Sequence, residues 1–307
     1  MTEPFGARLA TEFLAGRHLC AGVDPHAALL AEWELPDTAS GAERMGREVV
    51  AAAAGVAACV KPQVAFFERF GSAGILALER VLADARNAGL LIVADVKRGD
   101  IGSSFAAYAE AWLAPGSPLE ADAMTVVAYQ GFDTLEGAFP YVRQHGKGLF
   151  VLAATSNPEA RAVQRAVRED GRTVAAAVVA DARRANRGLV AAGSTVAGRT
   201  VGDIGVVLGA TLQLADFGIA VNDDDAGPWL PVLAPGFGHQ GGRIEDAGES
   251  FGALGHALLA NESRSILGGG PTGLADRVRE RAERIADALS AHPARSEDGT
   301  REGGAHA

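Results

Sequence analysis

The sequence of 307 residues contains few cysteines, no long apolar run and no excess of basic residues. Its two cysteines, Cys20 and Cys59, each lie in a short apolar run, so we expect buried free thiols in a reducing cytoplasm and no disulfide framework. The N-terminus lacks a secretion signal, and no apolar run is long enough to span a membrane. The net charge of −10 argues against a nucleic acid partner. The seven histidines lack the spacing of metal ligands, so we predict no metal.

Apolar residues make up 48% of the chain, which is enough for a full core, and short apolar runs alternate with helical patterns. We predict eight strands, at 18–24, 58–63, 90–97, 123–128, 149–155, 204–210, 230–234 and 265–267. Helices are expected at 11–14, 41–57, 72–89, from 105 to 113, from 157, at 174–187 and at 274–289. This alternation predicts an α/β fold of parallel units, and eight units predict a (β/α)8 barrel. A doubly wound open sheet is the competing architecture.

The predicted barrel forms a single domain over residues 1–290. The polar, glycine-containing stretch 291–307 is expected to be a disordered tail. The charged stretch 222–227 is interpreted as a solvated loop.

The chain is organised around residues 90–104, LLIVADVKRGDIGSS, which begin as a buried strand and end in charged residues. Asp95 and Lys97 are two positions apart in the strand and therefore point to the same face. Asp100 follows just past the strand end, where Gly99 is expected to let the backbone turn. The sequence thus predicts that carboxylate, ammonium and carboxylate groups meet at the mouth of the strand, where burial is costly unless charges are paired or used.

Other predicted strands also end in polar groups, which weakens the alternative of a merely structural salt bridge. Asp24 ends the first strand, Lys61 lies in the second, and Ser156 follows the fifth. The seventh strand runs into PGFGHQGG, which includes Gln240 and Gly241, and Arg264 lies beside the predicted eighth strand. Glycine-rich loops and an arginine after the last two strands of a barrel indicate a phosphate site.

Six segments together resemble the orotidine 5'-phosphate decarboxylase family, particularly its longer bacterial subgroup (type 2). They are GVDP, VKPQ, ADVKRGDIGSS, ATSNPE, APGFGHQGG and SRSILGG, in this order between about residues 22 and 270. The resemblance implies a homodimeric barrel in de novo pyrimidine biosynthesis that releases CO₂ from orotidine 5'-phosphate to form UMP without a cofactor. The stretch 171–202 and the tail are expected to lie outside the shared core.

The resemblance also implies roles for individual residues. Lys97 would donate a proton to C6, and Asp95 would lie against the substrate carboxylate. Asp100 and Ser104 would enter from the partner subunit, Ser104 standing where a threonine is common. The remaining implied contacts are Lys61 and Asp24 with ribose hydroxyls, Ser156 with the pyrimidine, and Gln240, Gly241 and Arg264 with the substrate's phosphate end.

The chemistry agrees with this reading, because loss of CO₂ leaves negative charge at C6 and a site without an electron sink must stabilise it electrostatically. A lysine between two carboxylates is expected to stay protonated. Two other functions stay open from the residues alone. One is a Mg²⁺-dependent sugar-phosphate decarboxylase or aldolase that shares the D-x-K core, and the other is a barrel that binds a phosphorylated ligand without catalysis.

Overall fold

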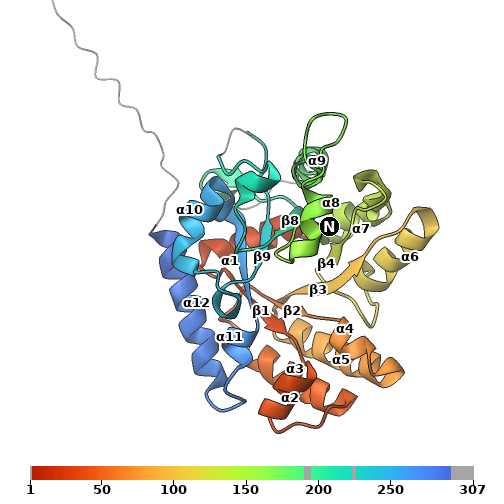
Figure 1. The fold of residues 1–307 in the computed structure, drawn as a ribbon. Helices are drawn as coiled ribbons and strands as arrows, with labels where there is room; N and C mark the ends of the chain where they lie inside the picture. Colours follow the sequence, from red (N-terminus) through yellow and green to blue (C-terminus); the bar gives the residue numbers. More distant parts are fainter. Residues whose placement is uncertain (1, 190–194, 223–225, 292–307) are drawn as a thin grey trace, which may run out of the picture.

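Eight parallel strands close into a barrel in the computed structural model, which describes residues 2–189, 195–222 and 226–291 (Figure 1). The barrel strands are β1 (Leu19–Val23), β2 (Cys59–Pro62), β3 (Leu91–Arg98), β4 (Ala123–Val126), β5 (Gly148–Ala154), β8 (Ile204–Leu208), β9 (Val232–Pro235) and β10 (Leu258–Glu262). They follow one another in chain order around the barrel, and β10 pairs with β1 to close it. The predicted (β/α)8 barrel is therefore confirmed.

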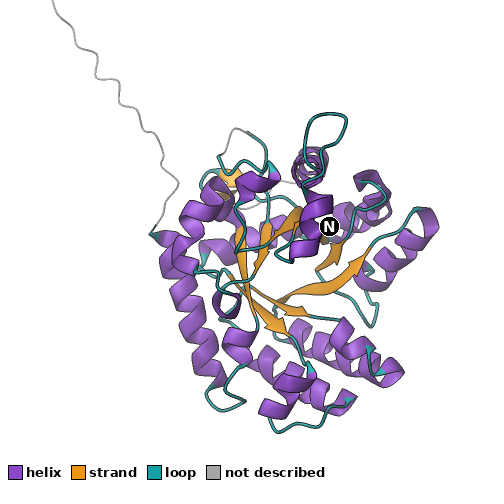
Figure 2. Cartoon of the chain, in the orientation of Figure 1, coloured by secondary structure: helices purple, strands orange, loops and turns teal. Residues whose placement is uncertain are grey.

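Helices lie around the outside of the barrel (Figure 2), with α1 as an exception at its N-terminal end. They are α1 (Phe5–Leu14), α2 (Ala27–Glu32), α3 (Ala39–Ala53), α4 (Ala65–Glu68), α5 (Gly71–Asn87), α6 (Gly102–Leu113), α7 (Phe139–His145), α8 (Arg161–Gln164), α9 (Val174–Leu189), α10 (Ala247–Phe251), α11 (Arg264–Leu267) and α12 (Leu274–Ser290). Strands covered on both faces consist of almost uninterrupted apolar residues, and all five residues of β1 and of β8 are buried. No helix among the described residues is long and apolar enough to cross a membrane.

The eighth strand was predicted in the wrong place. Residues 265–267 lie in the short helix α11, and the strand is β10, which precedes it. The error arose because β10 ends in two polar residues, Asn261 and Glu262, which both become buried. Asn261 donates to the Cys20 carbonyl, and Glu262 accepts from Arg281 at 2.8 Å, so partners elsewhere in the chain satisfy these groups. Arg264 consequently follows the last strand instead of preceding it.

The stretch 171–202 was wrongly placed outside the shared core. Its helix α9 packs against β5 and β8 and occupies the position of the barrel helix between them. The helix predicted to begin at Pro158 is only a 3₁₀ turn followed by the four-residue α8. After α9, β6 (Thr195–Val196) and β7 (Arg199–Thr200) form a small antiparallel hairpin. The predicted tail at 292–307 and part of the predicted loop, 223–225, lie outside the described residues.

Helix α1 covers the N-terminal end of the barrel. Its residues Phe5, Leu9 and Phe13 pack with inward-facing strand residues, and the Phe5 and Phe150 rings meet edge to face with centroids 6.0 Å apart. Cys20 and Cys59 lie in register on β1 and β2 within the same inner cluster. Both are buried free thiols, as predicted. A second, larger cluster lies between the strands and the outer helices.

One buried carboxyl joins α1 to the barrel. Asp203, just before β8, is 7% exposed and accepts a hydrogen bond of 2.8 Å from the Gly6 backbone N–H. Desolvation raises the pKa of Asp203 to about 6, although the Gly6 hydrogen bond and the Arg8 charge act in the opposite direction. The folded chain therefore retains this proton at pH values where the unfolded chain, with an ordinary pKa of about 4, has released it.

We predict that Asp203 makes the free energy of unfolding decrease as the pH rises from about 4 to about 6. Asp203→Asn keeps an acceptor for the Gly6 N–H but has no proton to lose. The free energy of unfolding of wild type, taken relative to this variant, should therefore fall by about 2–3 kcal/mol across that window. Urea denaturation of both proteins at several pH values measures the difference. A constant difference between pH 4 and pH 7 would contradict the prediction.

Candidate active site

Asp95 lies at the centre of a cluster of donors from three neighbouring strands. Its Oδ2 accepts from Lys61 Nζ on β2 at 2.7 Å and from Gln63 Nε2 at 2.9 Å. Its Oδ1 accepts from Lys97 Nζ at 2.5 Å and from Thr125 Oγ1 on β4 at 2.9 Å. The barrel thus brings the predicted residues Lys61, Asp95 and Lys97 together, with the carboxylate between two ammonium groups.

The charges in this cluster hold one another ionised despite burial. Burial alone would raise the pKa of Asp95, but the charges of Lys61 and Lys97 hold that pKa well below its usual range. Burial alone would lower the pKa of Lys61, and the charges of Asp95 and Asp24 raise it above its usual range. The Lys61 side chain is 6% exposed, whereas that of Lys97 is 44% exposed. Lys97 therefore carries the more accessible of the two ammonium groups.

The backbone around Lys97 is irregular. Lys97 has φ +47°, a left-handed conformation that is rare for residues other than glycine. Gly99, where a turn was expected, does not have a positive φ. Glycine is required here because the backbone passes close to Val127: a Cβ at position 99 would lie 2.3 Å from the Val127 carbonyl oxygen. Lys97 and Asp95 share a side of β3 as predicted, but through a bulged strand and not a regular one.

Asp100 does not join the cluster within its own chain, so the prediction of a lysine between two carboxylates is wrong for one subunit. Its Oδ1 accepts from the backbone N–H of Ile101, the next residue, at 2.8 Å. Lys97 forms an ion pair with Asp95 and with no other residue that the structure describes. Ser104, on the first turn of α6, is exposed.

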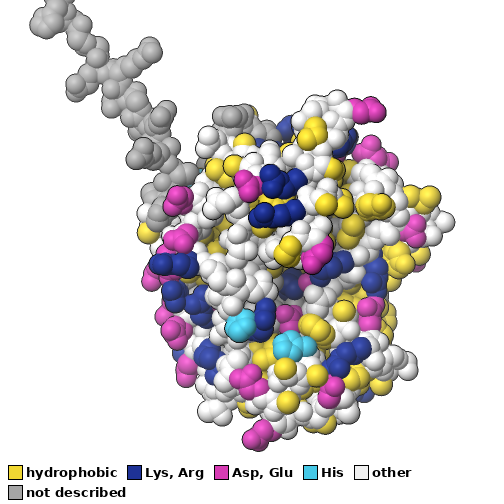
Figure 3. All heavy atoms as spheres, in the orientation of Figure 1, with side chains coloured by type: hydrophobic (Ala, Val, Ile, Leu, Met, Phe, Trp, Pro, Cys, Tyr) yellow, Lys and Arg dark blue, Asp and Glu magenta, His cyan; other side chains and the backbone are white. Residues whose placement is uncertain are grey.

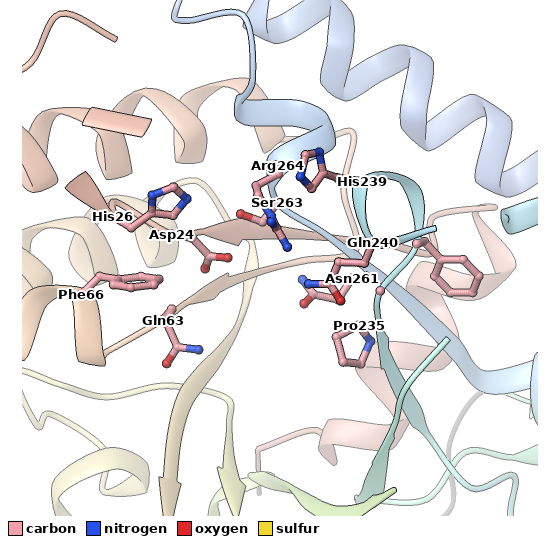
Figure 4. A pocket seen from close by; sticks show the side chains of 12 residues that line it. Asp24, His26, Gln63, Phe66, Pro235, His239, Gln240, Asn261, Ser263 and Arg264 are labelled. Carbon is pink, nitrogen blue, oxygen red and sulfur yellow. The ribbon is translucent and has the colours of Figure 1, made fainter. Parts of the chain in front are cut away.

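A pocket of about 390 Å³ adjoins the cluster, and Gln63 takes part in both (Figure 4). Asp24, Gln63 and Phe66 lie toward one end in the view of Figure 4, and His239, Gln240 and Pro235 lie toward the other. The complete lining comprises Asp24, His26, Gln63, Phe66, Pro235, Gly236, Phe237, His239, Gln240, Asn261, Ser263 and Arg264. The predicted residues Asp24, Gln240 and Arg264 thus surround one cavity, although they come from distant parts of the sequence.

Several polar groups of this pocket have no protein partner. Asp24 Oδ1 and Ser263 Oγ are buried atoms without a hydrogen bond partner. No described residue forms an ion pair with the exposed guanidinium group of Arg264. Buried polar atoms normally find a partner, so these atoms indicate a bound polar molecule. The face drawn in Figure 3 carries histidine and basic side chains near its centre, with charges of both signs around them.

The glycine-rich loops only partly match the predicted phosphate site. The N–H groups of Gly238, Gly241 and Gly242 donate to carbonyl oxygens within the same loop. Gly241, with φ +94°, therefore shapes the loop, and its N–H is not free for an anion. The glycines at 268–270 do not line the pocket, and Gly269 N–H donates to Glu32 Oε1 at 2.5 Å. Arg264 and Gln240, which also line this pocket, carry side-chain N–H donors.

Sequence reasoning placed Ser156 near the site but missed several residues that line it or support it. Ser156 is exposed directly after β5. Gln63 was within reach of prediction, because it lies two positions after Lys61 and so shares its face. No pattern in the sequence pointed to Thr125, Asn261 or Ser263 as site residues. Thr125 is an isolated hydroxyl in an apolar strand, and the other two belong to the strand end that was misplaced.

A family model described as "Orotidine 5'-phosphate decarboxylase / HUMPS family" matches residues 17–275 of this chain. This chain belongs to that family. A Streptomyces coelicolor protein named orotidine 5'-phosphate decarboxylase is 46% identical over 285 residues, covering 92% of this chain and 96% of the relative. A Corynebacterium glutamicum protein of the same name is 44% identical over 287 residues, covering 92% and 97%.

Solved structures agree with the sequence comparisons. The crystal structure of a candidate orotidine 5'-phosphate decarboxylase from Streptomyces avermitilis has a TM-score of 0.84 and 46% identity, covering 94% of this chain and 98% of the other. The OMP decarboxylase of Leishmania donovani has a TM-score of 0.68 and 29% identity, covering 91% and 97%. The prediction of a decarboxylase of this family, made from the short sequence motifs, is confirmed.

The position of Asp95 predicts a large cost for removing its charge. Asp95→Asn leaves the buried Lys61 ammonium without the carboxylate that neutralises it. We expect the free energy of unfolding at pH 7 to fall by about 3–5 kcal/mol. Urea denaturation measures the loss. Asp37→Asn is the matched control, because it removes an exposed carboxylate that pairs with Arg69, and it should unfold at nearly the wild-type midpoint. Equal midpoints for the two variants would contradict the prediction.

Proposed function

We propose that this chain converts orotidine 5'-phosphate to UMP and CO₂ without a cofactor, in pyrimidine biosynthesis, with Lys97 as the proton donor to C6. The observation that carries the proposal is the cluster itself. An ionised Asp95 between two ammonium groups lies beside a pocket lined by Arg264, with which no residue of the described part of the chain forms an ion pair. The names of the relatives, about 45% identical over most of the chain, support the same reaction.

The proposed chemistry places the reacting carbon at Lys97. The bond between C6 and the carboxylate carbon breaks, CO₂ leaves, and the electron pair remains on C6. The Lys97 ammonium stabilises this charge as it develops and then transfers a proton to C6 to give UMP. The resulting amine recovers a proton from solvent. Asp95 keeps Lys97 oriented through the 2.5 Å hydrogen bond between Lys97 Nζ and Asp95 Oδ1. Its negative charge lies next to the position that the substrate carboxylate would occupy.

The pocket offers partners for the rest of the substrate. Asp24 Oδ1 accepts from a ribose hydroxyl in this proposal, which satisfies a buried oxygen that has no protein partner. Lys61 is largely enclosed by its contact with Asp95, so its part is to hold that carboxylate and to reach a ribose hydroxyl beside it. Ser156 contacts the pyrimidine.

The phosphate group binds at the opposite end of the pocket. The Arg264 guanidinium offers two parallel N–H groups to phosphate oxygens, and the Gln240 amide offers a further donor. These contacts are remote from C6. Binding energy gained there improves the rate when it is used to fix the reacting carbon against Lys97.

The Mg²⁺-dependent alternative is less consistent with the geometry. Both Asp95 oxygens already accept hydrogen bonds from two donors each, which leaves this carboxylate poorly placed to bind a cation. Turnover of orotidine 5'-phosphate in the presence of EDTA separates the two functions. The third possibility, a binding protein without catalysis, fails if any such turnover is observed.

We predict that the purified protein releases CO₂ from orotidine 5'-phosphate, with or without EDTA. The measurement is the decrease in ultraviolet absorbance of the orotate chromophore. Lys97→Ala should lower kcat on the order of 10² or more, because it removes the charge-stabilising group and the proton donor. Arg44→Ala, which removes an exposed cation on α3, is the control and should retain wild-type kcat. Substantial turnover by folded Lys97→Ala protein would exclude Lys97 as the donor, and an inactive wild type would exclude the proposed reaction.

The proposal includes a homodimer with shared active sites. Asp100 lies near the mouth of its own barrel without reaching Lys97, and Ser104 is exposed on the following helix. Ile101, which follows Asp100, is 60% exposed, and Tyr129, two residues after the Val127 that Gly99 approaches, is 83% exposed. Exposed apolar side chains of this kind favour contact with another chain. In a two-fold dimer, Asp100 and Ser104 of each subunit would complete the partner's site.

This arrangement predicts that two inactive variants restore activity when mixed. Lys97→Ala and Asp100→Ala subunits form a hybrid dimer in which one site carries both lesions and the other carries none. Random exchange makes about half of the dimers hybrid, so about a quarter of wild-type activity should return. The measurement is turnover before and after subunit exchange, which is verified with differently tagged chains. If Asp100 acted within its own chain, no activity would return after verified exchange.

A further inference from the structure

The strand that carries the reactive lysine is bulged opposite a single residue. In the ladder between β3 and β4, Ala94 stands opposite Met124 and Arg98 stands opposite Val126. Residues 95–97, three in number, therefore stand opposite Thr125 alone. Extra residues in one strand interrupt the ladder of backbone hydrogen bonds and redirect side chains, and such bulges occur next to active sites.

The bulge forces Lys97 into its left-handed conformation. A residue with a side chain pays a cost in free energy for φ +47° and keeps it only where its surroundings fix it. The Lys97 backbone N–H donates to Thr125 Oγ1 at 2.9 Å, so a side chain replaces the backbone acceptor of a regular ladder. Because Thr125 is 1% exposed, water does not compete for this bond.

The same hydroxyl also holds the acceptor of the lysine side chain. Thr125 Oγ1 donates to Asp95 Oδ1 at 2.9 Å, and this oxygen accepts Lys97 Nζ at 2.5 Å. The three bonds form a closed ring from the Lys97 backbone, through the Thr125 hydroxyl and the Asp95 carboxylate, to the Lys97 ammonium. A hydroxyl can accept and donate at once, which no apolar side chain of the same shape can do.

We propose that Thr125 is a positioning residue for the proton donor, because its hydroxyl fixes both the backbone and the ammonium group of Lys97. This inference rests on the proposed role of Lys97 in decarboxylation. Thr125 does not line the pocket, so its effect is transmitted through Lys97 and Asp95 and not through contact with the substrate. Loss of the hydroxyl should therefore reduce the chemical step and leave substrate binding nearly intact.

The test compares two substitutions that differ chiefly in the hydroxyl. Thr125→Val keeps the branched shape and removes the hydroxyl, and it should lower kcat by about 10²-fold, the effect of misplacing a reacting group by about 1 Å. KM should change by no more than about threefold, because the lost interaction acts only on the chemical step. Thr125→Ser keeps the hydroxyl and should retain kcat within a few-fold of wild type. Thr134→Val, which removes an exposed hydroxyl outside the site, should behave as wild type.

Each outcome separates this inference from the proposed function. If wild type does not decarboxylate orotidine 5'-phosphate, the proposed function fails. If wild type is active and folded Thr125→Val keeps its kcat, the positioning role is overturned. A folded Thr125→Ser variant whose kcat falls about 10²-fold below wild type would also overturn it, because the hydroxyl would then not be the determinant. This second arm is scored against wild type, so it decides the question even if Thr125→Val does not fold.

Discussion

The active site of this chain depends on one buried carboxylate that holds two ammonium groups. Asp95 receives four hydrogen bonds from residues in or beside β2, β3 and β4. Neither Asp95 nor Lys61 would bear burial of its charge without the other, because the free energy of desolvating an unpaired ion exceeds that of most other single interactions in a protein. The closed barrel meets this requirement, since it places the ends of three adjacent strands within hydrogen bond distance of one another.

The N-terminal end of the barrel is closed by apolar packing, and the C-terminal end carries polar and charged groups. At the N-terminal end, α1 covers the inner strand residues, and Asp203 ties it to β8 through the Gly6 N–H. At the other end lie the Asp95 cluster and a pocket whose Asp24 and Ser263 atoms are left without protein partners. Packing at one end therefore supports a preorganised polar surface at the other. The proposed decarboxylation, in which charge develops without an electron sink, would benefit from such fixed groups.

Local irregularity at β3 is part of this arrangement. A regular strand would have kept Lys97 in the ladder, whereas the bulge releases its backbone N–H to Thr125 and turns its side chain toward Asp95. Gly99 then permits close passage of the chain beside Val127. Three local features together fix the position of the Lys97 ammonium group. They are the left-handed backbone of Lys97, the lack of space for a Cβ at Gly99 and the hydroxyl of Thr125.

The sequence by itself determined the barrel, most of its strands and the family, because alternating apolar runs and words such as D-x-K-R-G-D-I are local patterns. It also placed Asp24, Lys61, Asp95 and Lys97 on strands near their ends and Gln240 in the loop after another, but it placed Arg264 ahead of the last strand instead of after it. Tertiary structure alone decided that β10 ends in buried Asn261 and Glu262, because their partners lie far away in the chain. It likewise decided that Lys61 flanks Asp95 on the side opposite Lys97, and that Thr125 supports Lys97. These outcomes depend on contacts between strands, which periodicity within one strand does not encode.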